Sequence, residues 1–139
     1  MTRERLENII IGTILESTED ENYFTDCRCC ITEDMFVDDT NRRIYHYVVE
    51  MQAQGNAEIC PSSIFARYGS EVMDILDAML EKVNNYSFLY LKWEYNEKRY
   101  VQYHMTGQKP SYTGVRFSDY VNAFIKMVYY EEQKRRNAA

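Results

Sequence analysis

Four cysteines are the residues of this chain whose type and spacing could most directly support chemistry. Cys27, Cys29 and Cys30 lie close together, whereas Cys60 stands alone before Pro61. Thiolates at short spacings can bind zinc tetrahedrally, but structural zinc sites usually draw on two such pairs, and the second pair is absent here. Cysteine is also among the residues most often buried for packing reasons. The pattern therefore favours structural burial, with no bound metal, over a zinc site.

An aromatic segment at Tyr86–Tyr103 could bind single-stranded DNA. Its tyrosines and its tryptophan alternate with lysine and arginine, and bases stack on such rings. Tyrosine is equally typical of protein interfaces, where its ring is buried and its hydroxyl keeps a hydrogen-bond partner. Glu94 and Glu97 cancel much of the positive charge. We therefore rank core or interface packing first and keep a single-stranded DNA-binding accessory protein, acting through this segment, as the alternative function.

Motifs for catalysis are missing from the sequence. His46 and His104 are the only histidines. For neither of them do we identify a cysteine or carboxylate that is spaced in the sequence as a second metal ligand. We expect His46 to lie on a helix surface. No nucleophile motif supports a Ser-His-Asp triad, although triad members can be far apart in sequence. The phosphate-binding pattern G-x-x-x-x-G-K-[ST] is not found around any of the five glycines. The sequence thus predicts a protein that is not an enzyme and uses no cofactor, with a small enzyme of unknown type as the weakest alternative.

Charge is distributed unevenly along the 139 residues, a length that suits one domain with its own core. Residues 1–69 carry 6 Lys and Arg against 13 Asp and Glu, whereas residues 70–139 carry 10 against 9. Neutralisation of phosphates supplies most of the non-specific affinity for DNA. The acidic N-terminal half therefore predicts only weak or indirect DNA contact and favours a basic protein partner.

No segment has the features of a membrane span or a secretion signal. The longest apolar run, Ile9–Ile11, is far shorter than the roughly 20 residues that cross a bilayer. The first residues, MTRERLEN, also lack the apolar core of a secretory signal. We therefore expect a cytoplasmic protein without a membrane partner, whose cysteines stay reduced.

The spacing of apolar residues predicts an all-α fold. Its first part is a compact helical head over residues 1–86, and its second part is an antiparallel helical hairpin over residues 87–139, packed on the head, on a second subunit or on both. The helices expected in the head cover residues 4–16, 23–30, 41–54 and 61–69, and Ser70 can cap a fifth helix whose apolar positions repeat at helical spacing up to Val83. The hairpin consists of helices at 87–105 and from Phe117 onwards, joined at 106–116 by a connection that contains glycine and proline.

The stretch from Phe36 to Gly55 gives the most detailed local prediction. A run of Asp and Thr ending at Asn41 favours a helix N-terminus and precedes apolar positions at helical spacing, of which Ile44 and Tyr45 are the first. Gly55 stands where a glycine can adopt the left-handed conformation and end the helix. Phe36 is placed just upstream, where its ring can cover the start of the helix.

This order of aromatic anchor, polar cap, helix and glycine resembles the N-terminal domain of DnaB-type replicative helicases. In that family an aromatic residue is followed five positions later by His or Asn, and then by a basic and aromatic helix that ends in glycine. The opening helix is similar too, because Glu7 precedes a short apolar run broken by Gly12. The resemblance covers residues 4–100 and ends near Tyr100. The structural signature consists of Gly12, Phe36, Asn41, Ile44, Tyr45 and Gly55.

The resemblance implies a non-catalytic module of DNA replication and the primosome, without the ATPase motor. In the family, the helical head is followed by a helical hairpin that pairs subunits into dimers and, in full-length proteins, into a ring-shaped collar. We therefore expect a homodimer or higher homo-oligomer that docks a helicase motor, a primase or a loader. The chain resembles either an excised domain or, as Met1 slightly favours, a free-standing protein. A tyrosine-dense segment replaces the alanine-rich one that leads into the family's hairpin.

Aromatic residues in the C-terminal third exceed what one small core readily buries. Large exposed apolar patches usually mark partner sites, and aromatic residues dominate the binding energy there. The predicted partner-interface residues are Tyr90, Trp93, Tyr120, Phe124, Tyr129 and Tyr130.

Overall fold

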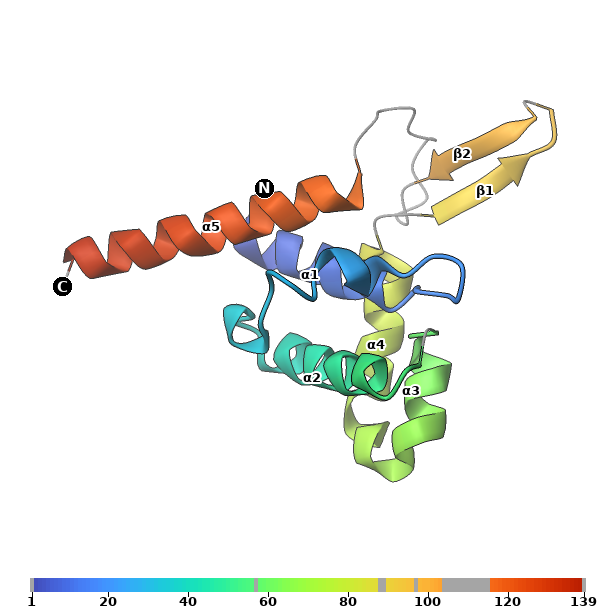
Figure 1. Cartoon of the computed structure of the whole chain (residues 1–139), viewed down its shortest axis with the longest axis horizontal. Coiled ribbons are helices and arrows are strands. Elements are labelled where there is room, and N and C mark those ends of the chain that lie inside the picture. The colour runs from blue at the N-terminus through green and yellow to red at the C-terminus, as the bar shows by residue number, and fades with distance from the viewer. Residues whose placement is uncertain (1, 57, 88–89, 97, 104–115, 139) are drawn as a thin grey trace.

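The computed structural model describes residues 2–56, 58–87, 90–96, 98–103 and 116–138, and for two strands it describes the backbone alone. Most of the described residues are helical, as the sequence predicts. Figure 1 shows a helical body with α1 (Arg3–Ile14) at its centre and a separate two-stranded β-hairpin at one end. Helices α2 (Asp39–Ala53), α3 (Pro61–Tyr68) and α4 (Met73–Tyr86) lie on one side of α1, and α5 (Phe117–Ala138) crosses the other.

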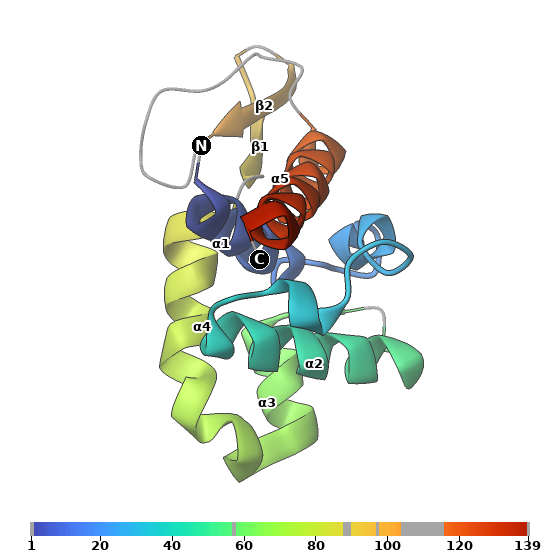
Figure 2. The same ribbon diagram turned by 90° about the vertical axis from the view of Figure 1, so that its left-hand side faces the viewer.

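Helix α1 is buried almost all round its circumference. Every residue from Leu6 to Ile14 is buried, because α2, α4 and α5 all pack against this helix. Figure 2 shows α1 lying between α4 and α5, with α2 below. A helix that is apolar on all faces belongs in a core. Three of its buried residues, Glu7, Asn8 and Thr13, are polar, and such groups need internal hydrogen-bond partners.

Helix α2 matches the local prediction closely. The Asp38 side chain accepts a hydrogen bond of 3.0 Å from the Asn41 amide, so the helix begins at Asp39, two residues before the predicted start. It runs to Ala53, and Gly55 follows with a φ of +83°, the left-handed conformation expected of a terminating glycine. The cap and the terminator therefore act as their residue types predict.

Short helical turns connect the longer elements of the head. The predicted helix at 23–30 is a 3₁₀ turn, η1 (Tyr23–Asp26), followed by further turns, and η2 (Glu33–Met35) precedes α2. A third turn, η3 (Gly69–Val72), separates α3 from α4, which therefore begins three residues after the predicted cap at Ser70. The prediction of helical structure is confirmed in these regions, but single helices at 23–30 and 70–83 are wrong in extent.

The predicted helix at 87–105 is wrong. Strand β1 (Tyr90–Glu94) pairs antiparallel with β2 (Arg99–Tyr103), and the register places Tyr90 opposite Tyr103 and Glu94 opposite Arg99. Tyrosine, tryptophan and valine are common in strands, so the residue types of these two segments are compatible with the observed β-hairpin. Lys98 adopts a φ of +50° in the turn. Among the described residues, the helical body is thus followed by a β-hairpin and one long helix in place of the first helix of the predicted helical hairpin. The predicted connection at 106–116 lies almost entirely outside the described residues.

Helix α5 forms as predicted from Phe117 and belongs to the same hydrophobic core as the head. Phe117, Val121 and Phe124 are buried along one side of it. With 22 residues it is about 33 Å long at 1.5 Å per residue. Figure 1 shows its C-terminal half extending past the rest of the body.

Candidate functional site

Phe36 is fully buried and joins three parts of the chain. Its ring lies 4.9 Å from the ring of Tyr45 on α2 and stacks on Phe124 of α5 at 5.4 Å, measured between ring centroids. The Tyr45 hydroxyl donates a hydrogen bond of 2.8 Å to the Ile31 carbonyl, and burial raises the pKa of this phenol. The prediction of Phe36 as an anchor at the start of α2 is confirmed.

A buried polar cluster fixes the start of α2 onto α1. The Glu7 carboxylate, 2% exposed, accepts hydrogen bonds from the amides of Val37 at 3.1 Å and Asp38 at 3.0 Å. The Asn41 side-chain amide donates to Glu7 at 3.1 Å and to Asn8 at 2.9 Å. Asn41 is therefore more than a capping residue, because its side chain connects two helices inside the core.

The cluster continues to α4 through Asn8, whose side-chain oxygen also accepts a hydrogen bond from the Lys82 ammonium. One turn along α1, a Cβ placed on Gly12 would lie 2.5 Å from the Lys82 carbonyl oxygen and 2.8 Å from the Ser87 nitrogen. These atoms belong to the backbone, so α1 and α4 approach closely only because residue 12 has no side chain. Gly12 belongs to the signature predicted from the sequence, whereas Asn8 and Lys82 do not.

Glu16 extends this contact by one further turn. Asn8 and Gly12 lie one turn apart on the α4 side of α1, and Glu16 follows in the turn just after this helix ends. Burial raises the pKa of the half-buried Glu16 carboxyl, and a hydrogen bond with Ser87 opposes that rise. Asn8, a polar residue within an apolar helical stretch, was the sequence signal that could have indicated a buried polar contact on α1, although it does not identify the partner.

All six signature residues occupy positions in or beside this framework. Ile44 and Tyr45 are buried on the inner face of α2. Gly12 and Asn41 form the contacts just described, Phe36 fills the space between α2 and α5, and Gly55 ends α2. In these contacts all six act as structural residues.

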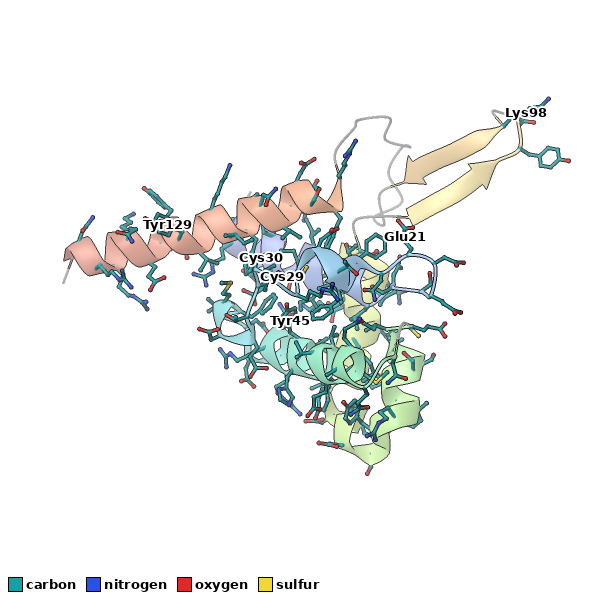
Figure 3. The ribbon with its side chains drawn as sticks, viewed as in Figure 1. Glu21, Cys29, Cys30, Tyr45, Lys98 and Tyr129 are labelled. Carbon is teal, nitrogen blue, oxygen red and sulfur yellow. The ribbon has the colours of Figure 1, made fainter. Side chains whose placement is uncertain are left out.

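The four predicted interface residues on α5, whose side chains are described, do not form one surface. Phe124 is fully buried against Phe36, so its assignment to a partner interface is wrong. Tyr120 is half-buried against the core. Tyr129 and Tyr130 are 64% and 62% exposed on the extending half of α5, where Figure 3 labels Tyr129.

Two further members of the predicted interface lie on the β-hairpin. Tyr90 and Trp93 belong to β1 instead of a helix, and their side chains lie outside the described residues. Among the interface residues whose side chains are described, the exposed pair on α5 is thus the part available to a partner.

A cavity of about 570 Å³ lies beneath the extending half of α5. Arg3 spans it, donating hydrogen bonds to Glu131 at 2.6 Å and to the Met35 carbonyl at 2.7 Å. Three arginines and three carboxylates line the cavity, so its charges balance. The lining residues are Arg3, Asp34, Met35, Phe36, Val37, Arg42, Val128, Glu131, Glu132 and Arg135.

The cysteines divide into buried and exposed residues. Cys27 is fully buried, as predicted, whereas Cys29 and Cys30 are exposed, and the expectation of structural burial is wrong for them. Cys60 is half-buried. Within the described residues, no group of three or more His, Cys, Asp or Glu side chains is arranged to hold a metal ion.

His46 lies on the exposed face of α2, as predicted, but it does have carboxylate neighbours. Its Nδ1 lies 2.9 Å from Glu33, and its Nε2 lies 3.5 Å from Glu50, one turn further along the helix. The Tyr68 hydroxyl donates to the same Glu50 carboxylate at 2.9 Å. His104 lies outside the described residues.

Across the described part of the chain, none of the helices combines the length and apolar character needed to cross a membrane. The chain matches no family model, no curated protein and no solved structure.

Proposed function

We propose that this protein is a non-catalytic interaction module of DNA replication, acting in the cytoplasm. It self-associates and docks a helicase motor, a primase or a loader through the extending half of α5. The observation that carries the docking surface is the pair of exposed tyrosines, Tyr129 and Tyr130, at the part of α5 that reaches past the body. The replication context rests on the sequence resemblance of the head to DnaB-type N-terminal domains.

Aromatic side chains on a rigid helix suit a protein partner. A tyrosine buries a large apolar area with few rotatable bonds, and residues of this type carry much of the binding energy in interfaces. Helix α5 is held at its N-terminal half by the core, so its C-terminal half presents these rings without further ordering. The ordering cost of binding is therefore low.

Sedimentation velocity over a range of concentrations tests the self-association step. We expect wild-type protein to dimerise and the double variant Tyr129→Ser, Tyr130→Ser to bind at least about tenfold more weakly, a difference of about 1.4 kcal/mol. Tyr95→Ser is the matched control, because Tyr95 is 84% exposed at the turn of the β-hairpin, away from α5. A wild-type protein that stays monomeric at high micromolar concentration would contradict the proposal.

Binding to a replication partner needs a separate measurement. We expect a helicase motor, a primase or a loader to be captured by immobilised wild-type protein and released by the α5 double variant. Equal capture by both proteins would place the docking surface elsewhere.

Single-stranded DNA binding is the second candidate, and one observation favours it. Tyr95 and Lys98 are both exposed in the turn of the β-hairpin, where a base could stack beside a positive charge. Oligonucleotide titration at two salt concentrations separates the candidates. Tight, strongly salt-dependent binding that Tyr95→Ala weakens would favour DNA over a protein partner.

A further inference from the structure

We propose that Cys29 and Cys30 form a redox-active pair that reacts with low-molecular-weight disulfides and closes to a disulfide between the two adjacent residues. Both side chains are exposed on the turn that follows η1, where Figure 3 labels them. Cysteine is normally among the most buried residue types, and packing gives no reason for two neighbouring exposed thiols. Access and thiol chemistry decide the role of such residues. This inference is independent of the replication proposal.

The other two cysteines are less accessible. Cys27 is fully buried, and its thiol donates a hydrogen bond of 3.8 Å to the Tyr23 carbonyl. Burial, with smaller contributions from Cys30 and Asp26, raises the pKa of this thiol. Cys60 is half-buried, and its Sγ lies 3.5 Å from the Ser63 hydroxyl oxygen. An oxidant in solution therefore meets Cys29 and Cys30 first.

The two exposed thiols have different surroundings. The Cys30 thiol donates a hydrogen bond of 3.3 Å to the Asp26 carbonyl and lies 3.7 Å from the Cys27 carbonyl oxygen. These contacts favour the protonated thiol, and burial raises the pKa of Cys30, with smaller contributions from Cys29 and Asp26. No hydrogen bond of this kind holds the Cys29 thiol within the described residues. Cys29 is thus the attacking thiol and Cys30 the resolving thiol.

The reaction balances with a disulfide such as oxidised glutathione. The Cys29 thiolate attacks one glutathione sulfur, forms a mixed disulfide and releases one glutathione thiolate. Cys30 then gives its proton to solvent and attacks the Cys29 sulfur, which releases the second glutathione thiolate. Two protein thiols are oxidised, and one glutathione disulfide is reduced to two thiols. The hydrogen bond from Cys30 to the Asp26 carbonyl is lost.

Oxidation of this pair acts directly on the core. Cys30 is followed by Ile31, whose carbonyl accepts the hydrogen bond from Tyr45 at 2.8 Å. The Tyr45 ring lies 4.9 Å from Phe36. Closing a ring across two adjacent residues changes the backbone beside Ile31, so we expect the environment of Tyr45 to change.

Mass spectrometry after treatment with oxidised glutathione tests the pair. Trypsin cleaves after Arg28 and Arg42, so the peptide 29–42 contains Cys29 and Cys30 and no other cysteine. We expect this peptide to become lighter by two hydrogens without linkage to another peptide. A bond to Cys27 or Cys60, or an unreacted peptide 29–42, would overturn the proposal.

Single variants assign the two roles. Cys30→Ser should accumulate a stable glutathione adduct on peptide 29–42, because the resolving thiol is missing. Cys29→Ser should react at least about tenfold more slowly than wild type, since the remaining thiol is held protonated. Cys60→Ser is the control and should behave as wild type. Equal rates for Cys29→Ser and Cys30→Ser would refute the division of roles.

Near-ultraviolet circular dichroism measures the link to the core. We expect the tyrosine signal of the folded protein to change on oxidation and to return on reduction, and Cys29→Ser should show no change. An oxidised wild-type protein with an unchanged tyrosine signal would show that the pair is not coupled to Tyr45.

Discussion

Two segments of this protein, residues 36–55 and residues 86–103, both space their apolar and aromatic residues in a way that suits a helix, but their described residues form different structures. In the first, a cap, a helical apolar pattern and a glycine terminator all favour a helix, and the tertiary contacts of Phe36 and Asn41 favour the same helix. In the second, aromatic spacing suits a helix, but residue types favour strands, and strands form. A local structure can be predicted from sequence when capping, spacing and residue type all favour it and the tertiary contacts agree. When these local signals favour different structures, contacts in the folded protein determine which one forms.

Replacement of Phe36 should have the largest effect on stability. We expect Phe36→Ala to lower the free energy of unfolding by about 3–5 kcal/mol, because the lost ring contacts both α2 and α5. Urea denaturation followed by circular dichroism measures this change. Val37→Ala is the control, since Val37 is 66% exposed and should be nearly neutral. A small effect of Phe36→Ala would show that tertiary contacts of Phe36 do not stabilise the helix in residues 36–55, which is the difference drawn above between the two segments.

Gly12→Ala should have the next largest effect. The added Cβ would lie 2.5 Å from the Lys82 carbonyl oxygen, and relief of this overlap requires α1 and α4 to separate. We expect a loss of about 1–3 kcal/mol in the free energy of unfolding. Gly55→Ala offers a comparison of mechanism, because residue 55 has open space around it and a φ of +83°, so backbone strain alone acts there, at about 1–2 kcal/mol. Crowding at residue 12 would be ruled out by a neutral Gly12→Ala variant.

The pH dependence of stability tests the contact of Glu16 with the end of α4. Burial raises the pKa of Glu16 in the folded state, so folded protein binds this proton more tightly than unfolded protein. The resulting stability is fully present below the unfolded pKa and is lost as the pH rises through the folded pKa. We expect Glu16→Gln to be more stable than wild type at pH 7 and equal to it in acid, by thermal unfolding across pH. Glu19→Gln, at an exposed position in the following loop, should show no such pH-dependent difference. A Glu16→Gln curve parallel to that of wild type would contradict the assignment.

The smallest effect is expected in the β-hairpin. Lys98 has a φ of +50°, which glycine adopts without strain, so Lys98→Gly should stabilise the turn by less than about 1 kcal/mol. Amide hydrogen exchange of β1 and β2 should slow, while the global unfolding midpoint changes little. Faster exchange in Lys98→Gly would show that the lysine side chain, and not the backbone, determines this turn.

The sequence alone was sufficient for several features of the fold. It predicted the helical body, the end of α2 at Gly55, the burial of Phe36 and the start of α5 at Phe117. These features depend on capping, periodicity and side-chain type, which act over a few residues and are visible in the sequence. The interface residues on α5 were predicted only in part from the sequence, because Tyr129 and Tyr130 are exposed as an interface requires, whereas Phe124 is buried.

Other features were decided only by the tertiary structure. Asn8 and Lys82 are 74 positions apart, and nothing in either segment marks them as partners. The exposure of Cys29 and Cys30 beside a buried Cys27 depends on which side of one turn faces the core. Residues 90–94 and 99–103 pair as two strands, although the aromatic spacing of this region also suits a helix. Local preferences of residue type and spacing determine helix starts and ends. Where those preferences leave two structures close in energy, contacts between distant residues determine which one forms.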